Sequence, residues 1–345
     1  MKLLTFSVAA YNVETYLPKL LETLLDRRCI DRIEILIIND GSSDKTAQIA
    51  EQYQTRFPDS VRLVNKENGG HGSTINKGIG EAAGRYFRAL DGDDWVDSDA
   101  LCSLLEHLES ADADVILTNY YKCYPDGHRT KERFHNLETG RIYAFEEVAP
   151  LVTWMCYHTV IYKTDLLKKN CIHLDEHCFY VDSELMILPI PYVNTVAFYD
   201  YSFYCYRLGL EGQSVSPTSR MKHAQDSYTV ANSLLKMYDN LSDKLSEPKR
   251  HYIEHGIAGH CTWHFRTILT YPPSLEKKKE VQDFDKLVRN HSKAIYNEME
   301  QFGKTSQLLQ IVRRSGYLLY YPAAWIVRRA SGSKSVLLRS RKSRS

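Results

Sequence analysis

Two aspartates separated by one glycine, Asp91-Gly92-Asp93, directly follow an apolar segment that ends at Leu90. Carboxylate oxygens are ligands that Mg²⁺ and Mn²⁺ prefer, and a bare glycine backbone lets a diphosphate come close. A cation held there would bridge the phosphates and neutralise the charge that builds on a departing diphosphate. A solvated acidic turn has the same composition, so this motif does not decide the matter alone.

Three further polar segments follow apolar runs in the same way. They are Tyr11-Asn12, Asn39-Asp40-Gly41-Ser42-Ser43 and Glu67-Asn68-Gly69-Gly70-His71-Gly72. Ligands of an open parallel sheet bind outside the carboxyl ends of its strands, so we expect all four segments at one edge. This convergence favours a ligand site and predicts Asp91 and Asp93 as metal ligands.

The glycine patterns that usually hold nucleotide phosphates are missing. Residues 9–14 contain no GxGxxG, which argues against a Rossmann dehydrogenase, and the chain contains no GxxxxGK[ST]. Side chains must therefore hold a nucleotide, and we expect Tyr11 to stack on the base and Asp40 to accept from its ring NH.

Apolar spacing predicts the elements that position these residues. Strands are expected at 3–8, 33–38, 61–64, 85–90 and 115–118. Helices are expected around 17–25, 46–57 and 73–83, and a fourth with Ser98 as its cap. Repeated β-α-β units with short connections predict an α/β fold with a mostly parallel, doubly wound sheet. Residues 119–207 indicate short strands, turns and brief helices, and the chain beyond Pro217 is expected to be helical.

Composition is that of an ordinary folded protein, and a net charge of +1 gives no general basic field for nucleic acid. No signal peptide is recognisable after Met1, and eight scattered cysteines without a CxxC indicate reduced, mostly buried thiols of a cytoplasmic protein. A disulfide such as Cys171–Cys178 is the less favoured alternative.

The end of the sequence suggests a membrane surface as a partner. Tyr317 to Val327 is apolar with Tyr and Trp, lies between Arg313-Arg314 and Arg328-Arg329, and is too short to span a bilayer. This pattern is typical of an interfacial helix on the inner membrane face, although a core-packing helix with a solvated tail fits nearly as well. The basic residues from 328 onward, with no acid among them, are Arg328, Arg329, Lys334, Arg339, Arg341, Lys342 and Arg344.

Five motifs together resemble, in order and spacing, those of family-2 glycosyltransferases with the GT-A fold, such as enzymes of bacterial exopolysaccharide, capsule and cell-surface polysaccharide synthesis. They are Tyr-Asn-Val-Glu-x-Tyr-Leu at 11–17, Asn-Asp-Gly-Ser-Ser-Asp at 39–44, Glu-Asn-Gly-Gly at 67–70, Asn-x-Gly-Ile at 76–79 and Leu-Asp-Gly-Asp-Asp at 90–94. The resemblance covers roughly the first third of the chain. It implies a nucleoside-diphosphate-sugar donor, usually a UDP-sugar, and inversion at the transferred sugar.

The resemblance also implies roles for single residues. Tyr11, Glu14 and Asp40 would contact the base and ribose, Asp91 would lie near the ribose and metal, and Asp93 would ligate Mg²⁺ or Mn²⁺. The full predicted donor set is Ala9, Tyr11, Glu14, Asp40, Asn68, Asp91 and Gly92, with Arg207 and Gln213 as weaker candidates in a polar loop that would close over the donor. The family's arginine before Asn76 is Ile75 here. Lys77 is one candidate to replace its donor contact, and an outward-facing helix lysine is the favoured interpretation of that residue.

Inverting transfer needs a general base opposite the leaving group, and one carboxylate suffices. The family places it in a Glu-Asp motif, which Val181-Asp182 matches here except that Val181 replaces the glutamate. Asp182 is the predicted catalytic base and Glu184 its rival. A helix N-cap is the structural alternative for Asp182.

These features predict an inverting hexosyltransferase-type enzyme acting on a hydroxyl of a glycan or polyprenyl-linked acceptor. We expect a nucleotide-sugar-binding part at 1–118, an acceptor and base part at 119–216, and a helical extension at 217–345. One alternative is a sugar nucleotidyltransferase, which normally has a glycine-rich phosphate loop after its first strand. Another is a non-catalytic, membrane-associated scaffold on a degenerate GT-A fold.

Overall fold

The computed structural model describes residues 2–209, 214 and 216–330. The chain forms two compact units, the first from residues 1–210 with 246–249 and the second from 211–245 with 250–345. All predicted site residues that the structure describes belong to the first unit. The predicted parts 1–118 and 119–216 both contribute strands to one sheet of this unit.

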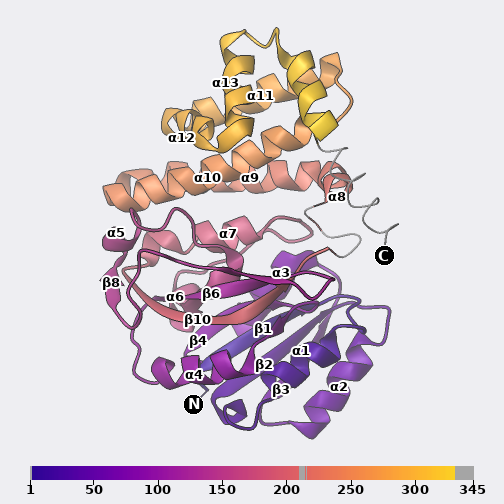
Figure 1. The fold of residues 1–345 in the computed structure, drawn as a ribbon, viewed down its shortest axis with the longest axis vertical. Coiled ribbons are helices and arrows are strands. Elements are labelled where there is room, and N and C mark those ends of the chain that lie inside the picture. Colours follow the sequence, from indigo (N-terminus) through magenta and orange to yellow (C-terminus); the bar gives the residue numbers. More distant parts are fainter. Residues whose placement is uncertain (1, 210–213, 215, 331–345) are drawn as a thin grey trace. The chain divides into compact units, whose positions relative to one another are not determined.

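A ten-stranded sheet forms the centre of the first unit (Figure 1). Its main order is β3-β2-β1-β4-β9-β6-β10-β5, with β7 added beside β6 and β8 beside β10. The strands are β1 Leu4–Ala10, β2 Ile33–Asp40, β3 Val61–Lys66, β4 Tyr86–Asp91, β5 Trp95–Val96, β6 Val115–Cys123, β7 Arg129–Glu132, β8 Ile142–Ala144, β9 Val160–Lys163 and β10 Thr195–Arg207. Strands β1 to β4 pair in parallel, as do β6 and β10, which confirms the predicted α/β class.

The central strands are buried on both faces, which explains their continuous apolar sequence. Leu4, Phe6 and Val8 of β1 are fully buried, as are Ile35 and Ile37 of β2. The prediction of short strands after 119 was wrong at β10, which runs for 13 residues. Register shifts between Tyr199 and Tyr204 bend this strand, and they hide its length from a simple alternation pattern.

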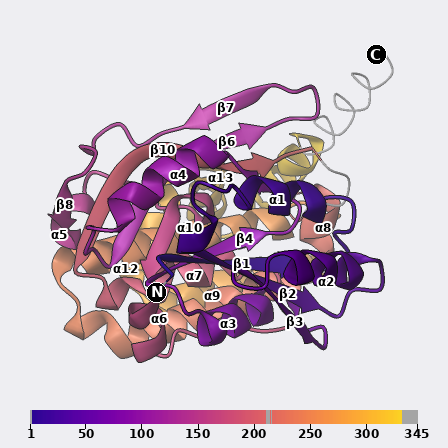
Figure 2. The ribbon, with the colours of Figure 1, turned by 90° about the horizontal axis from the view of Figure 1, so that it is seen from below.

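Helices cover the sheet in two groups. Helix α3 packs beside α6, whereas α1 contacts α2 (Figure 2). The helices of this unit are α1 Leu17–Leu24, α2 Thr46–Arg56, α3 Gly70–Glu81, α4 Ser98–Leu108, α5 Phe145–Val148, α6 Thr164–Lys169 and α7 Asp182–Ile187, with 3-10 turns at Ile30–Arg32, Tyr157–Thr159 and Ile190–Tyr192. The N-cap of α4 is Asp97 and not Ser98, because the Asp97 side chain accepts from the Ala100 N–H.

The expectation that all cysteines are reduced was wrong. Cys29, in the turn after α1, forms a disulfide with Cys102 of α4. The two residues lie 73 positions apart, so sequence spacing gave no sign of the pair. The six other cysteines are free, which includes both members of the alternative pair, Cys171 and Cys178.

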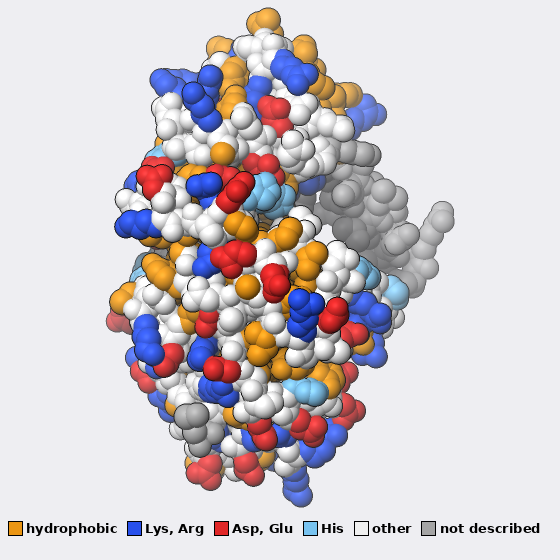
Figure 3. Space-filling view, turned by 90° about the vertical axis from the view of Figure 1, so that its left-hand side faces the viewer, with side chains coloured by type: hydrophobic (Ala, Val, Ile, Leu, Met, Phe, Trp, Pro, Cys, Tyr) orange, Lys and Arg blue, Asp and Glu red, His pale blue; other side chains and the backbone are white. Residues whose placement is uncertain are grey.

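The second unit is helical, as predicted from its sequence. Its helices are α8 Pro217–Lys222, α9 Ala224–Leu241, α10 Glu247–Ile268, α11 Leu275–His291, α12 Lys293–Glu298 and α13 Gly303–Arg314, with 3-10 turns at Ser242–Lys244 and Met299–Gln301 and a helical stretch at 320–330. Among the described residues, no helix has the length and apolar character needed to cross a bilayer. On the face drawn in Figure 3, Lys and Arg are interspersed with Asp and Glu, and neither sign forms an extended patch.

Candidate active site

The ends of β1, β2 and β4 bring three predicted segments to one edge of the sheet. In the strand register, Ala9 lies beside both Ile38 and Asp91. The loop after β1 is tied to the loop after β2, because the Asn12 side chain accepts from the Ser43 N–H at 2.8 Å. The predicted convergence of Tyr11, Asp40 and Asp91 on one edge therefore follows from the parallel register.

Tyr11 and Glu14 lie on the loop after β1. The ring of Tyr11 is 54% exposed, so a planar group can stack on it. The Glu14 carboxylate accepts from the Lys45 N–H at 2.8 Å, and Asp44 accepts from the Glu14 N–H at 3.0 Å. Glu14 thus holds the two loops together in addition to any contact with a ligand.

Asp40 ends β2 at this edge, but its side chain is buried. It is 2% exposed, and its carboxylate accepts from Lys66 Nζ at 2.6 Å and from the N–H groups of Gly69 and Gly70 at 2.9 Å each. The Asn68 side chain in turn donates to the Asp40 carbonyl oxygen at 2.9 Å. Asp40 and Asn68 therefore fix the glycine-rich loop, a role that differs from the expected contact of Asp40 with a base.

Gly92 is required by the packing of the acidic loop. Its N–H donates to the Ala9 carbonyl oxygen at 3.0 Å, and a Cβ at this position would lie 2.7 Å from that oxygen. The same Cβ would lie 3.1 Å from the Val13 side chain. The glycine therefore lets the loop approach the end of β1, a reason that does not depend on a diphosphate.

Three carboxylates gather at the end of β4. Asp91 accepts from the Tyr157 hydroxyl at 3.2 Å and lies 3.2 Å from His71 Nε2. Asp94 is buried and accepts from the Tyr204 hydroxyl at 2.6 Å. The possible metal-ligand atoms of Asp91, Asp94 and His158 lie within 4.8 Å of one another, and Asp93 is not a member of this group.

The charges of these groups are strongly coupled. Burial and then the charge of Asp91 raise the pKa of Asp93 to about 6, and burial followed by both neighbours raises the pKa of Asp94 well above its usual value. The pKa of Asp91 is lowered, because its bond to His71 and the His71 charge outweigh burial. A divalent cation would relieve this repulsion among oxygen donors, so the residues fit Mg²⁺ or Mn²⁺.

His71 and His158 flank the carboxylates, and the sequence did not single out either one. Burial alone lowers the pKa of His71, but the charges of Asp91, Asp182 and Asp93 reverse the effect and raise it. Burial lowers the pKa of His158 to about 3, and its ring stacks on Tyr206 with centroids 4.0 Å apart. His158 is therefore neutral at physiological pH.

Asp182 and Glu184 occupy different environments on the same short helix. Asp182 is exposed at the first position of α7, and the N-cap is Val181, so the N-cap alternative for Asp182 was wrong. Helix α7 contacts the 3-10 turn at Tyr157–Thr159, whose Tyr157 donates to Asp91, so Asp182 lies on an element next to the acidic cluster. In keeping with this, the charge of Asp182 helps to raise the pKa of His71. Glu184 is 2% exposed and accepts from the Asp175 N–H at 2.8 Å, and burial raises its pKa to about 8.

The segment that leads into α7 is held by the start of α3. The Asn76 side chain donates to the Leu174 carbonyl oxygen and accepts from the Leu174 N–H, both at 2.9 Å. A Cβ at Gly72 would lie 2.1 Å from the Asp175 carbonyl oxygen. The motif at 67–79 therefore positions the segment before Asp182, a function that its sequence did not reveal.

Arg207 joins the end of β10 to the acidic loop. Its N–H donates to Asp94 at 2.7 Å, its Nε donates to the Asp93 carbonyl oxygen at 2.6 Å, and its guanidinium lies over the rings of Tyr16 and Trp95. Arg207 therefore holds the loop in place. Gln213 lies outside the described residues.

Arg88 is a second residue that sequence analysis missed. It lies on β4, is 1% exposed and donates to the Val160 carbonyl oxygen, while its guanidinium faces the Tyr204 ring at 4.8 Å. Its Nε and Nη2 have no hydrogen-bond partner among the residues that the structure describes. An arginine within the apolar stretch of a buried strand was the available sequence signal, because such a charge is seldom buried without a partner nearby.

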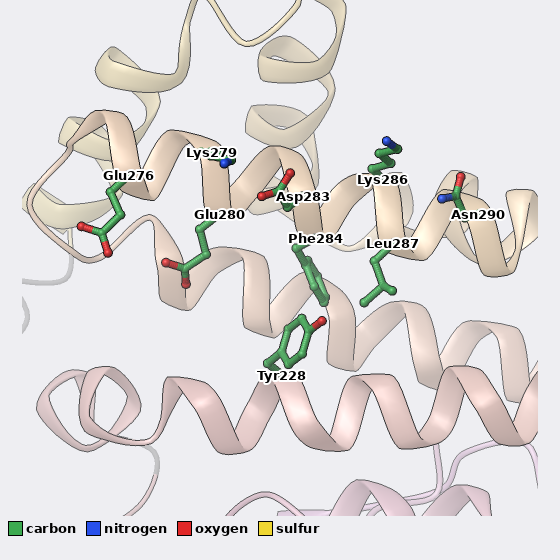
Figure 4. Close-up of a pocket in the computed structure, with 9 residues that line it drawn as sticks. All are labelled: Tyr228, Glu276, Lys279, Glu280, Asp283, Phe284, Lys286, Leu287 and Asn290. Carbon is green, nitrogen blue, oxygen red and sulfur yellow. The ribbon is translucent and has the colours of Figure 1, made fainter.

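The second unit contains a groove of about 560 Å³ between α9 and α11 (Figure 4). Tyr228 of α9 and Phe284 of α11 face each other at its base. None of its lining residues belongs to the predicted site. The lining residues are Tyr228, Glu276, Lys279, Glu280, Asp283, Phe284, Lys286, Leu287 and Asn290.

Residues 5–171 match the family described as Glycosyl transferase family 2. The chain carries a family-2 glycosyltransferase domain. The match includes the loops after β1, β2 and β4 with Asp91 and Asp93, and it ends before Asp182. The match confirms the predicted family for this domain.

Several bacterial glycosyltransferases and cell-wall proteins are similar to this chain. EpsJ of Bacillus subtilis is 28% identical over 268 residues, which cover 75% of this chain and 72% of EpsJ. EpsH of the same organism is 36% identical over 125 residues, 36% of each chain, and the minor teichoic acid biosynthesis protein GgaB is 25% identical over 72% of this chain. The chain thus spans about a third of the length of EpsH and 28% of GgaB.

The fold also has a counterpart among solved structures. S. aureus TarS 1-349, in complex with UDP-GlcNAc, has a TM-score of 0.64 at 19% identity, covering 97% of this chain and 92% of that one. This likeness extends over both units and confirms the GT-A fold predicted from the motifs.

Proposed function

We propose that this transferase moves a sugar from a UDP-sugar to a hydroxyl of a glycan or lipid-linked acceptor, with inversion, in the synthesis of a bacterial surface polysaccharide. The observation that carries the proposal is the cluster of Asp91, Asp93 and Asp94 at the sheet edge, with Asp182 exposed close to it. The UDP-GlcNAc complex of TarS and the teichoic acid proteins among the relatives support this donor and product class.

The donor site is assigned to the loops after β1 and β4. Tyr11 offers an exposed ring to the uracil, and Glu14 and Asp91 offer carboxylate oxygens to the ribose. Asp91 and Asp93 would hold Mg²⁺ or Mn²⁺, which when bound neutralises charge on the leaving UDP. Arg207 keeps the backbone of the acidic loop in place through its bonds to Asp93 and Asp94.

Asp182 is assigned as the general base. Its exposed carboxylate can accept the proton of an acceptor hydroxyl as that oxygen attacks the sugar. Glu184 cannot reach an acceptor, because it is buried against the Asp175 N–H. Its part is to hold the segment that precedes the base.

We place the protein in the cytoplasm, attached peripherally to the inner face of the membrane, where a polyprenyl-linked acceptor would be confined. Arginines at both ends of the apolar segment 317–327 support this location.

The direct test is UDP release from a panel of UDP-sugars with Mg²⁺, Mn²⁺ or EDTA. We expect release from at least one UDP-sugar, dependent on the cation, through transfer or slow hydrolysis. Release of pyrophosphate from UTP and a sugar 1-phosphate would instead identify a nucleotidyltransferase. Absence of UDP binding and of any turnover would favour the scaffold.

A further inference from the structure

The helical stretch 320–330, at the yellow end of the described chain in Figure 1, is apolar on two opposite sides. One side is buried in the second unit through Tyr320, Ala323, Ala324 and Val327, at the spacing of a single helix face. The other side exposes large apolar residues, which begin in the turn just before the helix. They are Leu318, Leu319, Tyr321, Trp325 and Ile326, which we call the outer face.

Side-chain interactions fix the outer face to the rest of the second unit. Arg313 forms an ion pair with the buried Asp285 of α11 at 2.5 Å, and the Tyr317 hydroxyl donates to the same carboxylate at 2.5 Å. The turn into the helix passes through Gly316 and Tyr317, both with positive φ. Because both ends of this turn are anchored, the outer face is presented as a stable surface that needs an apolar environment on its open side.

Arginine residues lie on both sides of the outer face in the sequence, and this part of the chain contains no Asp or Glu. Arg314 precedes it, Arg328 and Arg329 follow it, and all three are exposed. The Arg329 guanidinium lies 5.1 Å from the Trp325 ring. Residues 331–345 add five Lys or Arg and no Asp or Glu in the sequence. Aromatic and aliphatic groups beside clustered cations match the boundary between the headgroups and acyl chains of an anionic bilayer.

We propose that the outer face docks on an anionic phospholipid bilayer. The five residues of the outer face, Leu319 and Ile326 among them, enter the headgroup boundary while the arginines bind lipid phosphates. The helix lies in the surface, in keeping with the lack of a membrane-spanning helix among the described residues. This inference rests on the proposed membrane attachment and assigns its surface, but it requires nothing of the donor or the base.

The test measures partition of the full-length protein onto vesicles of phosphatidylglycerol mixed with phosphatidylcholine. The informative variant is Leu319→Ser/Ile326→Ser, whose parent side chains are 44% and 47% exposed. Its matched control is Leu151→Ser/Ile142→Ser in the first unit, with the same residue types at 40% and 48% exposure. We expect the outer-face variant to lower the partition coefficient by about tenfold or more, because binding scales with buried apolar area. The control should bind as the wild type does.

Two further readouts make the result decisive. High salt should weaken binding of the wild type, and vesicles of phosphatidylcholine alone should bind it poorly. UDP release in solution should be the same in both variants, so a missing activity would refute the proposed function without touching this inference. Equal vesicle binding by both variants would overturn the proposal. So would a wild type that ignores vesicles but forms a dimer that the outer-face variant breaks, since a second copy would then cover this surface.

Discussion

Asp182 and Glu184 show how burial gives two nearby carboxyl groups different properties. Asp182 is exposed, whereas burial raises the pKa of Glu184 to about 8. A buried carboxyl that loses its proton less readily than in the unfolded chain destabilises the fold as the pH rises from about 4.5 towards 8. The charged form of Glu184 does not stabilise the folded protein. A glutamine, which carries an uncharged amide, should therefore be tolerated at this position.

Glu184→Gln is therefore expected to be more stable than the wild type, by an amount that grows between pH 5 and pH 8. The amide oxygen can still accept from the Asp175 N–H. Thermal unfolding across this pH range measures the difference, with Asp182→Asn as the control. A difference that stays constant or shrinks with rising pH would show that Glu184 is charged in the folded protein.

Asp93 should make UDP binding depend on a cation. Asp93→Asn is expected to weaken UDP binding in Mn²⁺ by at least about tenfold, since one charged ligand is lost. Binding in EDTA should be the same in variant and wild type. Calorimetry also tests the pH dependence: Asp93, with its pKa raised to about 6, is protonated below that pH, so binding in Mn²⁺ should weaken there. An equal loss in EDTA would assign Asp93 a structural role.

At the residue scale, the sequence predicted types of group better than their partners. Asp91 and Asp93 could be singled out because the two carboxylates directly follow a strand, and Asp182 because it matches the base motif of the family that the sequence resembles. The roles of Asp40 and Gly92 could not, because Lys66, Gly69 and Ala9 reach them from other segments. His71 and Arg88 were missed for the same reason.

At the scale of elements, α3 positions the segment that leads to α7. Asn76→Ala removes both bonds to Leu174 and should lower the free energy of unfolding by about 1–3 kcal/mol. It should also lower kcat while leaving UDP affinity unchanged, because the segment before Asp182 is no longer held in position by α3. Chemical denaturation and steady-state kinetics measure these effects.

The matched control is Lys77→Ala on the same helix. Lys77 makes an exposed ion pair with Glu81, and such pairs contribute about 0–1 kcal/mol. If Asn76→Ala changes stability and kcat no more than Lys77→Ala does, the contact between α3 and the segment before α7 does not contribute to activity.

Strands with a continuous apolar sequence could be predicted from the sequence. The length of a strand that depends on tertiary contacts could not. β1 and β2 are buried on both faces, so their sequence alone indicates strands. The length of β10 depends on pairing with β6 across register shifts, which local sequence does not encode.

At the scale of the whole molecule, the Cys29–Cys102 disulfide closes a long loop of the first unit. Thiol titration of purified protein in denaturant should find six thiols before reduction and eight after it. Cys29→Ser/Cys102→Ser should lower the free energy of unfolding by about 2–4 kcal/mol, chiefly by freeing the unfolded chain. Eight thiols before reduction would show that the bond does not form.

The central claim is that this glycosyltransferase domain uses Asp182 as the base for transfer from a cation-bound UDP-sugar. The most direct measurement is UDP release by the wild type, Asp182→Asn and Glu184→Gln, with UDP binding measured in parallel. The account predicts at least a hundredfold loss of turnover in Asp182→Asn, unchanged UDP affinity in that variant, and turnover close to the wild type in Glu184→Gln. Normal turnover in Asp182→Asn together with an inactive Glu184→Gln would contradict it.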